Sequence, residues 1–281
     1  MSNETILVTG ATGKVGRRLT ALLREAGHDV RAVSRSTEIP FDWHDDATWG
    51  PALDGVGAAY LIAPDEPFPA DAFAAAAAKA GVRRLVGQSG RRIHVVTEAA
   101  GLSHDAIGMH AVQVAVQGSG LEWTVLQPNN FNQNFSEGDY HGSLLAGELV
   151  LPSEGIVEPF IDVEDIAAVA AAVLTEDGHH GKVYELSGPA AVSFDEAVAT
   201  IAAASGTDIA FHAVDPDGYA AAMRAEGLPE PLILFLDLMF RVMREGAIAD
   251  PADGVARVLG REPVAFADWA ARAAAEGAWS K

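Results

Sequence analysis

A glycine-spaced turn between a buried strand and an amphipathic helix constrains the fold of this chain more than any other feature. Residues 5–9 form a continuous apolar run, which is typical of a strand covered on both faces of a parallel sheet. The following stretch places Gly10, Gly13 and Gly16 at three-residue intervals, and apolar side chains then recur at helical spacing as far as residue 26. This strand, turn and helix predict the start of a doubly wound parallel Rossmann sheet, an α/β fold.

Each of the three glycines has its own role in this hypothesis. Gly10 permits a tight turn out of the strand, and Gly13 lets backbone N–H groups approach a pyrophosphate. Gly16 lets the helix pack close to the sheet, so that the positive end of the helix dipole faces the diphosphate. The spacing is G-x-x-G-x-x-G rather than the usual G-x-G-x-x-G. A purely structural turn is the alternative, but it needs fewer glycines.

Strand-like and helix-like segments continue to alternate through the first half of the chain. Strands are expected at 29–35, near 40–42, at 58–63, 84–88 and 122–127, with helices at 70–80 and 104–117. Residues 129–159 are rich in Asn, Gly, Ser and Glu and predict a binding loop. Residues 160–163 are expected to return to the sheet, and 182–187 to form a further strand. Helices are expected at 194–204, 216–225, 231–244 and 266–275.

Two domains follow from this pattern. Residues 1–128, with 157–188 returning to the sheet region, form the nucleotide-binding domain, and 129–156 with 189–281 form a smaller, mainly helical substrate-binding domain. The apolar helix at 231–244 is expected to serve as core or as a subunit interface, which makes a homodimer possible; a substrate-pocket lid is the other interpretation.

Charge and composition limit the possible partners. The formal charge of −20 argues against nucleic acid, because such binding depends on Lys and Arg that neutralise phosphates. The longest apolar run, 232–240, is too short to span a membrane and contains Asp237. The sequence has no Cys and no visible secretory signal, so a cytoplasmic protein without thiolate-bound metal is expected. The adjacent His179 and His180 point in different directions, which also disfavours a metal site.

The end of the second strand indicates which dinucleotide the fold would bind. An acidic residue there holds the ribose 2′-hydroxyl of NAD, whereas an arginine suits the additional phosphate of NADP. This chain has Ser34, Arg35 and Ser36, with no acid before Glu38. The pattern favours NADP(H), although Arg35 is also interpretable as an ordinary surface charge.

Together these segments resemble the NmrA-like branch of the atypical short-chain dehydrogenase/reductase superfamily. The resemblance rests on TGATGKVGRRL, AVSRS, GSGLEWTVLQPNNFNQNF, FIDVEDIAAVAAAVL and KVYELSGPAAVSFDEA, and it extends over about residues 4–275. It implies a Rossmann domain that binds NADP(H), with nicotinamide and substrate lying between the sheet and the C-terminal domain. Some members are quinone, azo-dye, imine or isoflavone-type reductases, and others bind the dinucleotide without turnover as redox sensors.

The resemblance also assigns cofactor-binding residues. It places the diphosphate on Gly10, Thr12, Gly13, Lys14 and Val15, and the 2′-phosphate on Arg35. It places the adenine near Asp42, the ribose near Ala63, Pro64 and Asp65, and the next strand end at Gln88 and Ser89. Pro128, Asn129, Asn130 and Phe131 would face the nicotinamide.

One departure from the superfamily affects the chemistry. Classical members use a Tyr with a Lys four residues later as a proton donor, but none of the tyrosines here has that partner, and Asp105 and Met109 stand near the two positions. His110 is the candidate substitute, with His104 and Asp105 as rivals. A histidine simply hydrogen-bonded on a helix surface is the other interpretation. Asn130, Asn132, Gln133 and Asn134 are candidates to bind a carboxamide or polar substrate, or to cap the loop.

These observations predict an NADPH-dependent reductase that transfers hydride to a small apolar or aromatic conjugated acceptor such as a quinone, an imine or an activated alkene. Such acceptors take the hydride with protonation by water or a weak acid, which suits a site without the Tyr-Lys pair. The alternative is a non-catalytic NADP(H)-binding redox sensor, and an isomerase that uses the fold without net redox change is a third possibility. Catalytic roles are assigned here to His110 and Asn130.

Overall fold

The computed structural model describes residues 4–64 and 66–280. The chain divides into two compact units. The first unit comprises Met1–Pro128, Val163–Leu186 and Asp253–Arg261. The second comprises Asn129–Asp162, Ser187–Ala252 and Glu262–Lys281.

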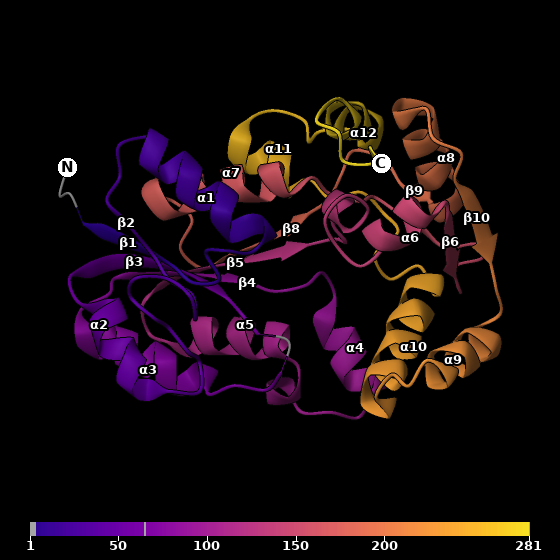
Figure 1. The fold of residues 1–281 in the computed structure, drawn as a ribbon. Coiled ribbons are helices and arrows are strands. Elements are labelled where there is room, and N and C mark those ends of the chain that lie inside the picture. Colours follow the sequence, from indigo (N-terminus) through magenta and orange to yellow (C-terminus); the bar gives the residue numbers. More distant parts are fainter. Residues whose placement is uncertain (1–3, 65, 281) are drawn as a thin grey trace. The chain divides into compact units, whose positions relative to one another are not determined.

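A six-stranded parallel sheet forms the centre of the first unit, in the order β2-β1-β3-β4-β5-β8 (Figure 1). Leu7 of β1 pairs with Arg31 on one side and with Ala59 on the other. The chain therefore reverses its direction of travel across the sheet at β1, and ligands of open parallel sheets bind at the carboxyl ends of strands beside such a switch point. The strands are β1 (Thr5–Val8), β2 (Val30–Ala32), β3 (Val56–Ile62), β4 (Arg84–Gln88), β5 (Glu122–Pro128) and β8 (Lys182–Leu186).

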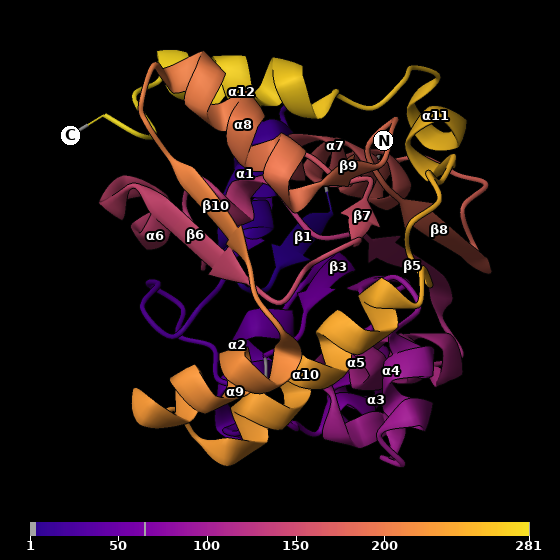
Figure 2. The same cartoon turned by 90° about the vertical axis from the view of Figure 1, so that its right-hand side faces the viewer.

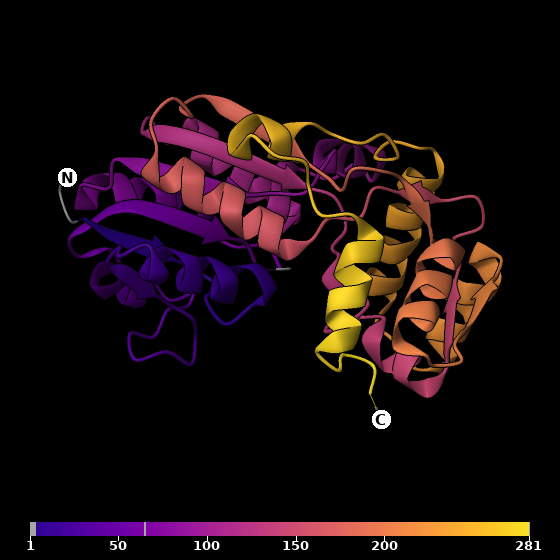
Figure 3. The same cartoon turned by 90° about the horizontal axis from the view of Figure 1, so that it is seen from above.

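Helices cover both faces of this sheet, which confirms the doubly wound α/β class. Helices α1 and α7 pack together on one face, and α3 and α5 on the other (Figures 1 and 3). The apolar stripe of α1 buries Val15, Leu19 and Leu23. The helices are α1 (Lys14–Glu25), α2 (Trp49–Leu53), α3 (Ala70–Ala80), α4 (Ile93–Ala99), α5 (Gly108–Gly118), α7 (Val163–Thr175) and α11 (Gly254–Leu259), with 3₁₀ turns η1 (Asp46–Thr48) and η2 (His104–Ala106).

An aromatic cluster fixes the segment that follows β2. The ring of Phe73 on α3 lies 5.5 Å from the ring of Phe41, 4.9 Å from that of Trp43 and 5.4 Å from that of Trp49, measured between centroids. All four side chains are buried, so they add to the apolar core beneath this segment. The segment that carries Asp42 is therefore held by packing although it has no regular structure.

The second unit contains two small sheets and five helices among its described residues (Figure 2). Strand β6 (Glu148–Leu151) pairs in parallel with β10 (Ala210–Ala213), and β7 (Val157–Glu158) pairs antiparallel with β9 (Val192–Ser193). Helix α8 packs against α12, and α9 against α10. The helices are α6 (His141–Ala146), α8 (Phe194–Ser205), α9 (Pro216–Ala225), α10 (Glu230–Arg244) and α12 (Phe266–Ala275), with the 3₁₀ turn η3 (Asn132–Asn134).

Several expectations from the sequence differ from the structure. Near residues 40–42 there is a single bridge between Ser34 and Pro40 in place of a strand. The predicted loop at 129–159 contains η3, α6, β6 and β7, and α4 was not expected. Residues 160–163 do not join the main sheet, because Ile161 instead forms an isolated bridge with Phe131. Residues 157–162 lie in the second unit and 253–261 in the first, since contacts with distant parts of the chain decide where short segments pack.

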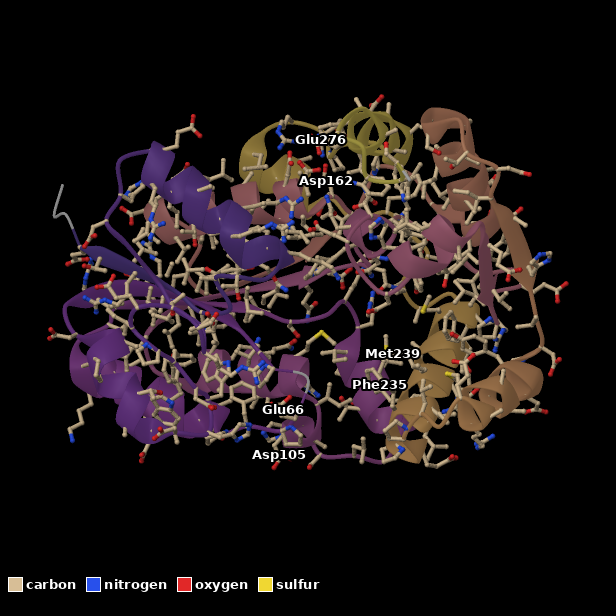
Figure 4. The ribbon with its side chains drawn as sticks, viewed as in Figure 1. Glu66, Asp105, Asp162, Phe235, Met239 and Glu276 are labelled. Carbon is tan, nitrogen blue, oxygen red and sulfur yellow. The ribbon has the colours of Figure 1, made fainter. Side chains whose placement is uncertain are left out.

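Helix α10 has apolar side chains on more than one face. Ile233, Leu238 and Phe240 are buried, whereas Leu232 and Leu234 are exposed. Figure 4 shows Phe235 and Met239 on this helix, where both are half-buried. The burial assigns part of the helix to the core, and a subunit interface or a lid remains a prediction for its other face.

Within the described part of the chain, no helix has both the length and the apolar character needed to cross a lipid bilayer.

Candidate functional site

The turn from β1 into α1 is tight enough to require glycine. Gly10 has a φ of +59°, in the left-handed region that favours glycine. A Cβ on Gly16 would lie 2.3 Å from the carbonyl oxygen of Gly10, and one on Gly13 would lie 3.2 Å from the same atom. The first distance is far inside van der Waals contact, so Gly16 allows α1 to approach the loop closely. The close approach at Gly16 is to the backbone of Gly10 and Ala11 in the loop, where the sequence had predicted an approach to the sheet.

The amino end of α1 offers backbone N–H groups. Helix α1 begins at Lys14, and among the described residues no side chain caps it and no acidic residue stands in its first turn. The first N–H groups of a helix have no partner within the helix and carry partial positive charge. An anion at this position would be stabilised by both effects. Val15 is buried, so only its backbone is available for this role.

A pocket of about 280 Å³ adjoins this turn within the first unit. It brings together several residues that the resemblance assigns to the cofactor: Gly10, Thr12, Arg35, Asp42, Ala63 and Pro64. Asp65, which the resemblance also assigns, lies outside the described residues. Residues far apart in the sequence thus meet beside the switch point at β1.

The pocket carries charges of both signs. Arg35 is exposed on its lining, where it presents a guanidinium suited to a phosphate. Asp42 accepts a hydrogen bond at Oδ1 from the backbone N–H of His44, at 2.9 Å, which orients its carboxylate. His44 Nε2 lies 3.7 Å from Glu66 Oε1, and both line the pocket (Glu66 is labelled in Figure 4). An exposed pair of this kind contributes little to stability.

Three residues of this lining were not predicted from the sequence. Trp43, His44 and Glu66 face the pocket although none was predicted to do so. Trp43 and His44 directly follow Asp42, so the position of Asp42 was the available signal. Glu66 had no signal of its own, because its place depends on how the chain leaves β3.

Gln88 and Ser89 are engaged in internal hydrogen bonds at the end of β4. The phenol of Tyr60 donates to Oε1 of Gln88 at 2.8 Å, and burial raises the pKa of that phenol. The Ser89 hydroxyl lies 2.9 Å from the carbonyl oxygen of Met109 and from Oε1 of Gln113. Ser89 is also buried. Both side chains therefore shape the sheet edge, and contact with a cofactor remains a prediction for them.

His110, the predicted proton donor, lies against α4. Its Nδ1 is 2.9 Å from Oγ1 of Thr97, and that hydroxyl donates its hydrogen to the carbonyl oxygen of Ile93, also at 2.9 Å. Because Thr97 has no second hydrogen to donate, Nδ1 of His110 must carry the proton in this bond. The neutral ring then has a lone pair on Nε2, which accepts a proton and does not donate one.

The surroundings favour that neutral form. Burial lowers the pKa of His110, and the neighbouring His104 and His94 lower it further, while Glu98 opposes them. The rival Asp105 is exposed, and a hydrogen bond from the Ser103 hydroxyl lowers the pKa of its carboxyl. Neither group is arranged as a ready proton donor near neutral pH.

Three amide side chains after β5, those of Asn129, Asn130 and Gln133, have defined partners, whereas within the described part of the chain neither polar atom of the buried Asn132 amide has one. Pro128 ends the strand, and its carbonyl oxygen accepts from the backbone N–H of Arg91. In the second unit, Asn129 is buried and donates from Nδ2 to the carbonyl oxygen of Ile248 at 3.0 Å. Phe131 is half-buried, and its backbone bridges to Ile161.

Asn130 is bound to a buried carboxylate of the same unit. Its Nδ2 lies 2.7 Å from Oε2 and 3.0 Å from Oε1 of Glu158. Gln133 donates to Asp162 at 2.7 Å, and Arg272 pairs with the other oxygen of Asp162. The amides of Asn130 and Gln133 are therefore each oriented by a carboxylate.

The adjacent histidines of the first unit have separate partners. Nδ1 of His179 lies 2.9 Å from the Tyr184 hydroxyl, and Nδ1 of His180 accepts from the backbone N–H of Trp123. Within the described ranges, no group of three or more acidic or histidine side chains is arranged to hold a metal ion.

The parallel sheet, its switch point and the glycine turn define a Rossmann-type fold, the class in which dinucleotides bind at such a turn. A model of the NmrA-like family matches residues 2–270. The chain belongs to the NmrA-like family.

Known relatives are similar over almost the whole chain. An NAD(P)H azoreductase of Xenophilus azovorans is 33% identical over 97% of this chain and 99% of its own. An uncharacterized oxidoreductase, YesF, of Bacillus subtilis is 32% identical over 98% and 97%. The structure of an NADPH-dependent quinone oxidoreductase of Escherichia coli, in complex with NADPH, superimposes with a TM-score of 0.78 at 24% identity, covering 95% of this chain and 99% of that one. The names of all three describe oxidoreductases.

Proposed function

We propose that this protein is an NADPH-dependent reductase that transfers hydride to a small conjugated acceptor such as a quinone, an imine or an activated alkene. The observation that carries the proposal is the glycine turn at β1, which stands beside a pocket lined by Arg35. The names of the relatives, an NAD(P)H azoreductase and an NADPH-dependent quinone oxidoreductase, support the same activity.

The residues of the first unit fit the parts of this cofactor. The backbone N–H groups at the start of α1 would hold the diphosphate, where a Cβ on Gly13 or Gly16 would crowd the loop. Arg35 would pair with the 2′-phosphate, since the end of β2 offers no carboxylate for a 2′-hydroxyl. Asp42 would face the adenine, and Ala63 and Pro64 the ribose. When bound, the dinucleotide supplies the hydride.

In this reaction the chain itself would orient the cofactor and the acceptor more than it would transfer a proton. None of Tyr60, Tyr140, Tyr184 and Tyr219 has a lysine four residues later. His110 holds its proton toward Thr97, so it is placed to accept a proton at Nε2. Acceptors whose reduced forms are protonated by water suit such a site.

The test is NADPH oxidation measured against a panel of quinones, imines and activated alkenes, with NADH as the comparison. NADPH-dependent turnover of at least one class supports the reductase. Tight NADPH binding with no turnover of any acceptor would instead mark a redox sensor, and product formed without NADPH consumption would mark an isomerase. A cytoplasmic location and a homodimer remain predictions.

A further inference from the structure

Two carboxylates line the pocket beside the glycine turn, although the pocket is proposed to hold a phosphorylated ligand. Asp42 and Glu66 both face it, together with the guanidinium of Arg35. A carboxylate accepts hydrogen bonds and repels a phosphate, so neither group suits the phosphates of a dinucleotide. Both suit a neutral part of the ligand that donates N–H or O–H groups.

His44 connects these two carboxylates. Its backbone N–H donates to Oδ1 of Asp42 at 2.9 Å, and its Nε2 lies 3.7 Å from Oε1 of Glu66, within ion-pair range of a protonated ring. Within the described part of the chain, Oδ2 of Asp42 and Oε2 of Glu66 have no partner. Each carboxylate is thus held through one oxygen and offers the other as an acceptor.

The segments that carry the two carboxylates are held together by packing within the first unit. The carbonyl oxygen of Asp42 accepts from Nε1 of Trp49 at 3.0 Å. The ring of Trp43 lies 4.6 Å from that of Phe68, measured between centroids, and both side chains are buried. This contact joins the segment after β2 to the segment after β3 that carries Glu66. The separation of the two carboxylates is therefore set by a rigid frame beneath them.

The direction of the Glu66 side chain depends on its partner. Its loop is fixed at Pro64, because a Cβ on Gly108 of α5 would lie only 2.1 Å from the Pro64 carbonyl oxygen. The Glu66 side chain itself is 60% exposed, and that of His44 is 49% exposed. A pair this exposed contributes little to stability. Its consequence is to turn the Glu66 carboxylate toward the segment of Asp42.

We propose that Glu66 joins Asp42 in recognising the 6-amino group of the purine base of the cofactor, and that His44 positions both carboxylates. Adenine carries an exocyclic amine with two hydrogens to donate, whereas a 6-oxopurine carries an acceptor oxygen at that position. Two acceptors in one pocket match the two hydrogens and repel the oxygen. The inference rests on the proposed function and makes Glu66 a specificity-determining residue of the same site.

A ribose hydroxyl is the other neutral donor that a dinucleotide offers. The pair with His44 links Glu66 to the segment of Asp42, which favours the base over the ribose. Two dinucleotides that differ only in the base separate these alternatives, because they have the same ribose hydroxyls.

The test is the binding of NADPH and of its analogue in which hypoxanthine replaces adenine, measured by calorimetry on the full chain. The wild type should bind NADPH about tenfold or more tightly than the analogue, because a site that accepts from an N–H group rejects a ligand without it. In Glu66→Gln the amide can turn its N–H₂ group toward a carbonyl oxygen. We expect this variant to lower the ratio of the two affinities by about fivefold or more.

The matched control is Glu38→Gln, which removes an exposed carboxylate after β2 that lies outside the lining of the pocket. It removes the same charge and should leave the ratio of affinities unchanged. His44→Ala should lower the ratio in the same direction as Glu66→Gln. His44→Gln keeps a donor toward Glu66 and should restore part of the ratio, whereas a merely structural role of His44 would change both affinities equally.

The outcomes separate this inference from the proposed function. If Glu66→Gln weakened both dinucleotides equally, Glu66 would face a group that they share, and if it changed neither affinity, Glu66 would lie outside the site. Either result overturns the inference and leaves the reductase intact. If the wild type discriminates the two bases through Glu66 but oxidises NADPH with no acceptor, the proposed function fails and the base site stands.

Discussion

Gly16→Ala gives the most direct measure of how closely α1 approaches the glycine turn. The new methyl carbon would lie 2.3 Å from the carbonyl oxygen of Gly10 and 2.9 Å from the Cα of Ala11. Both neighbours are backbone atoms, which cannot rotate away as a flexible side chain does. The substitution therefore requires the helix and the loop to move apart.

The expected loss of stability is the difference between two opposing effects. Overpacking a tight contact costs about 1–3 kcal/mol, and the backbone atoms involved here place the cost at the upper end. Alanine gains about 0.5–1 kcal/mol over glycine inside a helix. We expect a net loss of about 2 kcal/mol and, at roughly 2–4 °C per kcal/mol, a decrease in Tm of about 4–8 °C.

The assay pairs thermal unfolding with NADPH binding, and Gly50→Ala is the control. Gly50 is exposed in α2, and no atom lies within 4 Å of an added Cβ, so this change should be neutral or stabilising by about 0.5–1 kcal/mol. Gly16→Ala should also weaken NADPH binding by about tenfold or more, since the amide groups of the loop lose their alignment. If the two variants had equal Tm values and equal affinities, the loop would not require this close approach.

Three further predictions concern the same unit. Arg35→Ala should raise the Kd for NADPH by roughly 10–100-fold and leave the Kd for NADH almost unaffected, because a charged hydrogen bond contributes about 1.5–3 kcal/mol. Equal losses of affinity in titrations with the two dinucleotides would contradict the proposal that Arg35 binds the 2′-phosphate. In Gly13→Val the new Cβ would lie 3.2 Å from the Gly10 oxygen, so the same titration should show no dinucleotide binding, while the circular dichroism spectrum should show that the fold is retained. Retained affinity would mean that the loop is only a turn. His110→Asn keeps a donor toward Thr97 but removes a group whose pKa is lowered from 6.5, chiefly by burial. A histidine whose pKa is lowered in the folded protein costs stability as the pH falls below its ordinary pKa, because the unfolded chain then binds the proton more readily. The free energy of unfolding, measured with denaturant at a series of pH values, should therefore decrease less toward acid pH in this variant than in the wild type. Identical pH profiles would contradict the lowered pKa of His110.

The main sheet and the glycine turn were predictable because their signals are local. The apolar run of β1 and the helical spacing of α1 each lie within a dozen residues, and the structure confirms both. The limits predicted for α9 and α12 also agree with those observed. The short strands β6, β7, β9 and β10 were missed, because each gains its partner from a distant segment and carries little periodicity of its own.

The sequence by itself determined the fold class, the glycine turn and the presence of Arg35 three residues after β2, since each depends on neighbouring residues. Only the tertiary structure decided which hydrogen-bond partners the polar side chains have. Asn129 bonds to a residue 119 positions away and Asn130 to one 28 positions away, and spacing along the chain encodes neither contact. The proton position on His110 was likewise set by Thr97 of another helix. Hydrogen-bond direction depends on the partner, and folding brings that partner into place.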